Sequence, residues 1–226
     1  MSARDSILAK VRASLGTAGE PAARMEAVSA RLTSHAPGII PARGQIDAPK
    51  RVKLFAEMAE KANATVQRVR SGASVPKAVS SYLRSHNLPA AIRLGLDPRL
   101  TAMGWQEQKA LTVKTGPSDG FDEAGVSHAF GGIAETGTLM LTSGPDNPTT
   151  INFLPDHHIV VINEADIAGD IEALWSALRA RGMDMPRTVN FITGPSRSGD
   201  IEQTLLLGAH GPRALHIIIV GGAAGP

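Results

Sequence analysis

Glu135 is the first residue of this chain whose type and position could do chemistry. It stands in the turn Ala-Glu-Thr-Gly-Thr at 134–138, after two glycines and directly before the apolar run 139–141. A carboxylate in such a turn can act as a general base, a nucleophile or a hydroxyl-binding group. It can equally satisfy the N–H groups of its own loop. We take Glu135 as a catalytic candidate, with ligand-binding neighbours Thr136, Gly137 and Thr138.

A second polar stretch, TGPSRS at 193–198, follows the apolar run 189–192. It combines backbone N–H groups, two hydroxyls and a guanidinium at an expected helix start, which suits a carboxylate or a phosphate. The stretch has no Walker lysine and does not match the G-x-G-x-x-G pattern. The alternative is an ordinary capped turn from strand to helix. The ligand-binding candidates here are Thr193, Gly194, Ser196, Arg197, Ser198 and Asp200, joined by Gly211 after the expected helix.

His210 is the second catalytic candidate, although a lone histidine before a Gly-Pro turn more often serves as a cap. Glu202 lies eight residues before His210 on a similar face of the expected helix, so the spacing allows a contact between the two side chains without requiring it. His157 and His158 precede an apolar run and must point to opposite sides of a strand. Neither has a partner at metal-ligand spacing, so we expect no structural metal.

Composition narrows the classes of function. The chain has 226 residues, 42% of them apolar and 19% charged, which is ordinary for a globular protein. A formal charge of +2 with scattered Arg and Lys does not favour nucleic acid as a partner. With no cysteine, the chain cannot hold zinc or an iron–sulfur cluster through thiolates. The sequence shows no signal peptide and no run of membrane-spanning length, so we expect a cytoplasmic protein.

The candidate residues are positioned by the stretch 188–220, which predicts a strand, a helix and a second strand. The apolar run 189–192 ends at Gly-Pro, a helix is expected from 196 to about 209, and the run 215–220 is typical of a strand buried on both faces. Such a βαβ unit binds ligands at the carboxyl ends of its strands. We therefore expect Glu135 to lie opposite Ser196 in one shared pocket at that edge.

The rest of the chain predicts an α/β fold. Strands are expected at 64–69, 90–94, 111–113, 138–141 and 158–162, and helices around 54–58, at 75–83 and from a cap at Asp97. Asp166 is expected to cap a further helix that ends at Gly182. Residues 1–45 carry two helical patterns, at 4–15 and 24–33, and an extended arm. We interpret 1–45 as a helical appendage that docks on the body or on a partner, and 46–226 as the α/β domain.

Three motifs in this order and spacing make a resemblance recognisable: A-E-T-G at 134–137, P-x-x-H-I-V at 155–160, and T-G-P-S-R-S-x-D-I-E at 193–202 with G-x-H-G-P at 208–212. Residues 50–222 resemble the LUD-domain family, specifically its lactate utilization protein C subgroup. Ser198-Gly199 replaces the Thr-Ala that is common there. The resemblance implies a three-layer, mostly parallel sheet flanked by helices, similar to the sugar-isomerase and CoA-transferase superfold.

The resemblance also implies a part in oxidising L-lactate to pyruvate together with partner proteins that carry iron–sulfur clusters. The leading hypothesis is therefore a non-redox subunit that binds a small anion such as lactate. The sequence does not identify a cofactor, and it leaves the oligomeric state open. One alternative is a stand-alone enzyme that uses Glu135 for acyl transfer or isomerisation. The other is a metabolite-binding or assembly module without chemistry.

Overall fold

The structure is a computed structural model that describes residues 2–16, 21–182, 185–201 and 204–221, with the backbone alone described at 21, 198–201 and 204–207. Contacts between Cα atoms divide the chain into two units, Met1–Ile40 and Pro41–Pro226. The first unit contains the helices α1 (Ala3–Ser14) and α2 (Pro21–Ser34), in line with the two helical patterns. A capping box between Ser2 and Asp5 begins α1.

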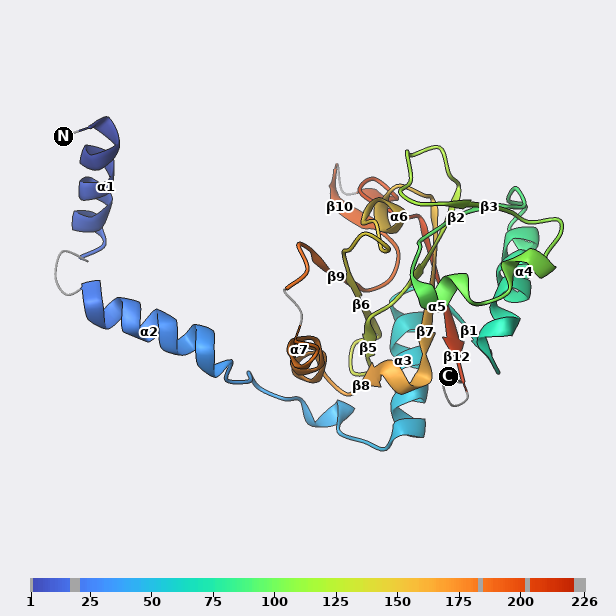
Figure 1. Ribbon diagram of the computed structural model, residues 1–226, viewed down its shortest axis with the longest axis horizontal. Coiled ribbons are helices and arrows are strands. Elements are labelled where there is room, and N and C mark those ends of the chain that lie inside the picture. Colours follow the sequence, from blue (N-terminus) through green and yellow to red (C-terminus); the bar gives the residue numbers. More distant parts are fainter. Residues whose placement is uncertain (1, 17–20, 183–184, 202–203, 222–226) are drawn as a thin grey trace. The chain divides into compact units, whose positions relative to one another are not determined.

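The second unit is built on a six-stranded sheet in which every pairing is parallel (Figure 1). Its strands, in spatial order, are β1 (Thr65–Val69), β12 (Ala214–Val220), β7 (His157–Asn163), β4 (Ala124–His128), β2 (Ala91–Leu94) and β3 (Thr112–Thr115). The strands in the middle of this order are buried on both faces, as the apolar runs of β7 and β12 predict. The expected α/β fold with a parallel sheet and flanking helices is confirmed.

A second, mixed sheet is an addition that the sequence pattern did not predict. Its strands are β8 (Ile167–Ala168), β5 (Gly131–Ile133), β6 (Thr138–Thr142) and β9 (Val189–Ile192), in that spatial order. β6 pairs antiparallel with both β5 and β9, whereas β5 and β8 are parallel. The run 189–192 is thus a strand as predicted, but it lies in the other sheet from β12. The βαβ unit expected over 188–220 is therefore wrong.

Helices and short helical turns cover both faces of the large sheet (Figure 1). The helices are α3 (Ala48–Lys61), α4 (Val75–Ser85), α5 (Pro98–Thr101), α6 (Thr150–Phe153) and α7 (Ile171–Ala180), and the 3₁₀ turns are η1 (Ala42–Gly44), η2 (Gly72–Ser74), η3 (Trp105–Glu107) and η4 (Glu164–Asp166). Asp97 caps α5 as predicted, with its side chain accepting from the Arg99 N–H. Asp170, not Asp166, caps α7, because β8 separates Asp166 from that helix.

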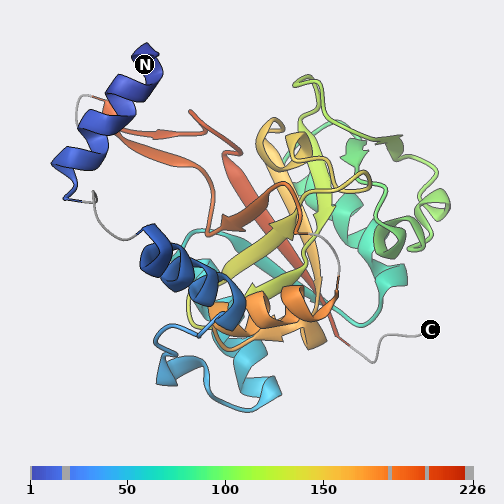
Figure 2. The ribbon, with the colours of Figure 1, turned by 60° about the vertical axis from the view of Figure 1, so that its left-hand side comes forward.

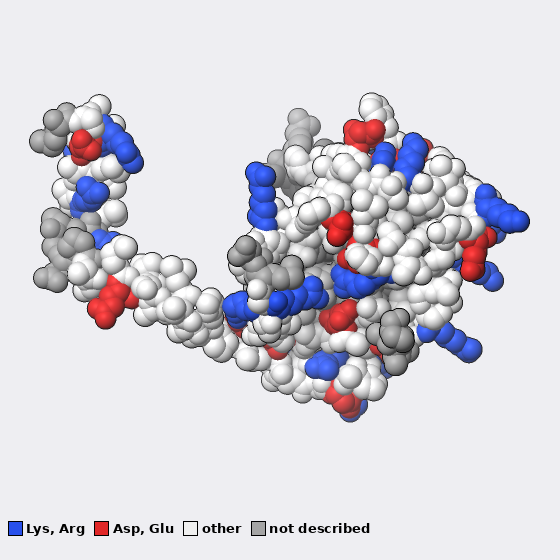
Figure 3. All heavy atoms as spheres, in the orientation of Figure 1, with Lys and Arg blue, Asp and Glu red and all other residues white. Residues whose placement is uncertain are grey.

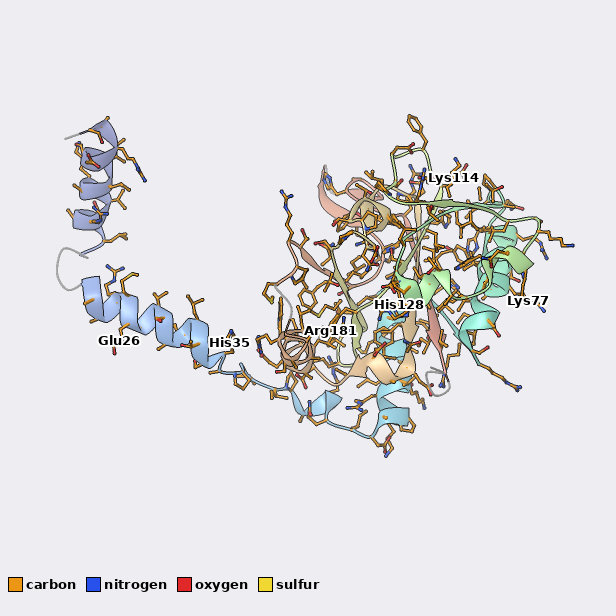
Figure 4. The ribbon with its side chains drawn as sticks, in the orientation of Figure 1. Glu26, His35, Lys77, Lys114, His128 and Arg181 are labelled. Carbon is orange, nitrogen blue, oxygen red and sulfur yellow. The ribbon has the colours of Figure 1, made fainter. Side chains whose placement is uncertain are left out.

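The core has successive layers around the two sheets. On one face of the large sheet, α4 and α5 bury residues such as Val79 and Leu100 against Ile218. On the other face, Phe55 of α3 and Leu139 of β6 pack against the large sheet. Beyond the small sheet, α7 supplies a third cluster, and the Arg181 guanidinium at its end lies 4.2 Å from the Phe130 ring centroid (Figure 4). The small sheet and α3 are therefore held on the large sheet by apolar burial.

The segment after β9 folds as a hairpin, which corrects the predicted helix at 196–209. β10 (Arg197–Ile201) and β11 (Thr204–Leu207) pair antiparallel with a register irregularity between Ser198 and Ile201, and the hairpin projects from the body in Figure 2. A helical crossover is required only between parallel strands of one sheet. Because β9 and β12 belong to different sheets, a hairpin suffices, and Gly199 within it disfavours a helix.

Candidate functional site

A pocket of about 290 Å³ lies between the end of β9 and the amino ends of β7 and β12. It is walled by apolar and polar residues in roughly equal number: Asn152, Phe153, His158, Phe191, Ile192, Thr193, Gly194, Pro195, Ser196, Arg197, His210, Gly211, Pro212 and Leu215. A volume near 300 Å³ stands at the lower end of the range for ligand sites, and a few polar groups on apolar walls are typical of them.

This pocket brings together six of the residues that the sequence singled out: Thr193, Gly194, Ser196, Arg197, His210 and Gly211. Its position in the fold differs from the expectation, since His158 and Leu215 stand at the amino ends of their parallel strands. The predicted carboxyl-end location is therefore wrong. The cause is that β9 belongs to the small sheet, where it pairs antiparallel with β6, and not to the large sheet.

The anion-binding argument also changes, because no helix follows Ser196. β10 begins at Arg197, so the dipole of the helix that was expected after Ser196 does not contribute to the pocket. The side chains of Ser198 and Asp200 lie outside the described residues, as does Glu202, the partner considered for His210. What supports anion binding here is the exposed guanidinium of Arg197 and the exposed imidazole of His210.

Backbone hydrogen bonds tie the two loops of the pocket together. The Ser196 N–H donates to the Pro212 carbonyl over 2.8 Å, and the Gly208 N–H donates to the Ser196 carbonyl over 3.1 Å. Gly194 has φ +72°, and a Cβ on it would come within 2.0 Å of the Ala62 carbonyl oxygen. A side chain there would be strained and would clash, so glycine is required where this loop crosses the end of α3.

Glu135 is not among the residues that line the pocket. Its N–H donates to the Gly169 carbonyl, just after β8, and its carbonyl accepts from the Arg43 guanidinium. Glu135 lies in the turn between the inner strands β5 and β6 and bonds toward β8, whereas the 193–196 loop follows the edge strand β9. Glu135 is 7% exposed, and burial together with the charge of Asp170 raises its pKa, while Arg43 acts in the opposite direction. The pocket that Ser196 lines is therefore not shared with Glu135, contrary to the expectation.

Three threonines nevertheless connect the two motifs. The Thr138 Oγ1 lies 2.8 Å from that of Thr136 and 2.6 Å from that of Thr193. This follows from the antiparallel register, in which Leu139 pairs with Ile192 and Thr138 comes opposite Thr193. Gly137 packs onto α3, where a Cβ would come within 2.2 Å of the Ala59 backbone nitrogen. The motif 134–138 therefore positions the start of the pocket loop through Thr138.

Three buried polar residues form a network that the sequence analysis did not identify: Ser127 of β4, Asn152 of α6 and His158 of β7. The Ser127 Oγ lies 2.9 Å from Asn152 Oδ1 and 2.9 Å from His158 Nε2. Asn152 and His158 also line the pocket. The sequence could have indicated this network through the polar residue within each buried segment, because buried polar side chains in native proteins are nearly always hydrogen-bonded.

His157, by contrast, faces the other side of β7, as the strand pattern predicts. Its Nδ1 lies 2.9 Å from the Tyr82 hydroxyl, in a ring cluster with His86 and His216. Burial raises the pKa of Tyr82 to about 12 and lowers that of His216 to about 4. Within the described ranges, no group of three or more His, Cys, Asp or Glu residues is arranged to hold a metal ion.

The pocket has one sign of charge. No Asp or Glu is among the described residues that line it, whereas Arg197 is. Elsewhere, Lys and Arg alternate with Asp and Glu on the visible face of the second unit, without a continuous basic surface (Figure 3). None of the helices in the described ranges is long and apolar enough to cross a bilayer.

Residues 121–220 match the family model of the LUD domain. This part of the chain is therefore similar to the LUD domain. It contains all the residues that line the pocket, from Asn152 to Leu215, whereas α3 and α4 precede it.

Curated proteins similar to the chain include two named lactate utilization protein C. That of Halalkalibacterium halodurans is 35% identical over 101 residues, and that of Bacillus subtilis is 32% identical over 146 residues. The alignments cover 43% and 54% of this chain and 44% and 60% of those proteins. An uncharacterized protein of Neisseria meningitidis is 39% identical over 98 residues, which is 43% of this chain and 42% of that protein. The chain thus spans about half the length of the curated relatives that it matches.

A similar fold is also found in a crystal structure. A DUF162 family protein from Deinococcus radiodurans superposes with a TM-score of 0.56 at 21% identity, covering 78% of this chain and 99% of that one. At this identity the similarity establishes a shared fold.

Proposed function

We propose that the chain is a component of an L-lactate utilisation system and that the pocket beside β9 binds a small carboxylate. The observation that carries the proposal is a pocket with Arg197 and no described acidic residue in its wall, in a chain similar to lactate utilization protein C. A guanidinium offers a carboxylate paired, charge-assisted hydrogen bonds. Thr193, Ser196 and His210 add further polar groups at the same wall.

Calorimetric titration of the purified chain with L-lactate tests this proposal. Arg197→Ala should weaken binding by about 1.5–3 kcal/mol, the usual contribution of a charged hydrogen bond. Arg68→Ala is the matched control, because Arg68 pairs with Glu164 at the surface and does not line the pocket. Equal affinities of wild type and Arg197→Ala would remove this residue from the site.

We further propose that the redox step is completed with partner proteins that carry iron–sulfur clusters. The chain contains no cysteine, so it cannot ligate a cluster through thiolates. α1 supports partner docking, since its apolar residues Ile7 and Val11 are 62% and 47% exposed and its C-cap residue Leu15 is 67% exposed. Pull-down of cluster-containing proteins by the full chain, lost on deletion of residues 1–40 while lactate binding persists, is the expected result. Equal pull-down by both forms would contradict a docking role for α1.

A stand-alone enzyme that uses Glu135 is the second candidate. It is favoured by the burial of this carboxyl and by its raised pKa, which are common at catalytic acids and bases. Turnover of a candidate acyl-transfer or isomerisation substrate by the purified chain, abolished in Glu135→Gln, would support it. Full activity of that variant would leave Glu135 with a structural role.

A further inference from the structure

The buried network of Ser127, Asn152 and His158 leaves one ring nitrogen of His158, a residue of the pocket wall, without a partner among the described residues. All three side chains are nearly inaccessible, at 5%, 6% and 1% exposed. The Ser127 hydroxyl donates to Asn152 Oδ1, so its only proton is used there. The contact between Ser127 Oγ and His158 Nε2 then requires that Nε2 carries the proton and donates it. In this tautomer His158 Nδ1 holds a lone pair.

That lone pair has no partner in the part of the chain that the structure describes, where His158 Nδ1 is a buried atom without a hydrogen bond. An unsatisfied buried acceptor is costly, and native proteins keep few of them. Two other histidines among the described residues share the feature, His128 and His216. His128 borders a cavity of only about 10 Å³, and His216 is stacked on Tyr82, so His158 is the one that lines a pocket of ligand size.

The imidazole of His158 is also neutral. Burial lowers its pKa to about 3, so it carries no charge at neutral pH. Its one N–H is used by Ser127 and Nδ1 can only accept, so the carboxylate of a ligand is left to Arg197. A neutral imidazole with a free Nδ1 accepts a hydrogen bond from a ligand group that donates one.

We propose that His158 determines the specificity of this pocket by accepting a hydrogen bond from a hydroxyl of the bound acid, which selects 2-hydroxy acids over 2-keto acids. A hydroxyl satisfies Nδ1, whereas a keto oxygen presents a second lone pair to it. A site that hydrogen-bonds a ligand hydroxyl rejects analogues without one, because its own buried group is then left unpaired. The inference rests on the proposed function, since it requires that the pocket binds carboxylic acids.

Three ligands distinguish the role of His158 from the proposed function of the pocket. They are L-lactate, pyruvate and propionate, each titrated by calorimetry into the full chain. We expect L-lactate to bind roughly 3- to 10-fold more tightly than the other two, the effect of one neutral hydrogen bond. Equal binding of all three would overturn the role of His158 and leave the proposed function intact. Binding of none would overturn both.

The residue itself is tested by His158→Phe, with His157→Phe as the matched control on the opposite face of β7. His158→Phe should bind the three acids with equal affinity, while His157→Phe should keep the preference for lactate. A preference that persists in His158→Phe would contradict the inference.

A second measurement does not depend on the folding of a variant. In ¹⁵N-labelled wild type, the His158 Nδ1 resonance should have the shift of an unprotonated nitrogen and should move upfield when lactate is added, as expected for a nitrogen that accepts a hydrogen bond. Propionate should leave it in place. A protonated Nδ1, or a resonance that lactate binding does not move, would overturn the inference.

Discussion

The hydroxyls of Thr138 and Thr193 are joined by a hydrogen bond of 2.6 Å between their Oγ1 atoms. Thr138 begins β6, next to the turn that contains Glu135, and Thr193 begins the loop that lines the pocket. This bond is therefore the direct side-chain link between the two motifs that define the LUD-domain resemblance. Because Thr138 is only 7% exposed, its hydroxyl depends on this partner and on Thr136.

The first prediction concerns this link. Thr138→Val and Thr193→Val should each lower the free energy of unfolding by about 0.5–1.5 kcal/mol, the net contribution of a neutral hydrogen bond. In urea denaturation the double variant should lose less than the sum of the singles, because both changes remove the same bond. Strict additivity would show that the two hydroxyls do not act together.

Gly137 provides a test of the packing of the small sheet on α3. It has φ +66°, and an added Cβ would overlap the Ala59 backbone nitrogen. Gly137→Ala should therefore lower the free energy of unfolding by more than about 3 kcal/mol, through backbone strain and overlap together. Gly182→Ala is the control, since Gly182 has φ +63° but no atom within 4 Å of the added Cβ. Strain alone should cost the control about 1–2 kcal/mol. Similar losses in both would contradict the tight contact.

The stability of the protein should fall in mild acid. Burial lowers the pKa of His158 to about 3 and of His216 to about 4, from the ordinary value of 6.5. Below pH 6.5 the unfolded chain therefore binds protons at these histidines, whereas the native state does not. The free energy of unfolding is thus highest above this pH and decreases as the pH falls toward 4. With both groups contributing, the slope should reach roughly 2–3 kcal/mol per pH unit.

Urea denaturation between pH 7.5 and 4.5 measures this slope. His216→Gln, which can keep the hydrogen bond to the Thr65 hydroxyl, should reduce the slope by about half. An unchanged slope in this variant would assign the acid sensitivity to other groups.

Glu135 should behave in the opposite way. Burial and the charge of Asp170 raise its pKa above 4.5, so the native state holds a proton that the unfolded chain has already released. Stability from this group is therefore present at low pH and is lost as pH rises through its native pKa. Glu135→Gln should be more stable than wild type at pH 7.5, and the difference should vanish near pH 4. A variant that is less stable at pH 7.5 would show that the carboxylate makes a stabilising contact.

Local patterns were sufficient for most of the elements. The continuous apolar runs at 158–162 and 215–220 predict buried parallel strands, and Asp97-Pro98 predicts the start of α5, because burial on both faces and helix capping depend on neighbouring residues. The absence of cysteine by itself excludes thiolate-bound clusters. The motif at 193–197 with His210-Gly211 also predicts much of the pocket wall.

Tertiary structure alone decided where those elements meet. The sequence and the structure agree that 189–192 is a strand, but its antiparallel pairing with β6 places it in the second sheet. The segment 197–207 is then a hairpin, and the pocket lies at the amino ends of β7 and β12. Strand pairing joins residues that are distant in sequence, so no local pattern specifies it. The same holds for Ser127, Asn152 and His158, which come from three separate elements and meet only because β4 and β7 are neighbours under α6.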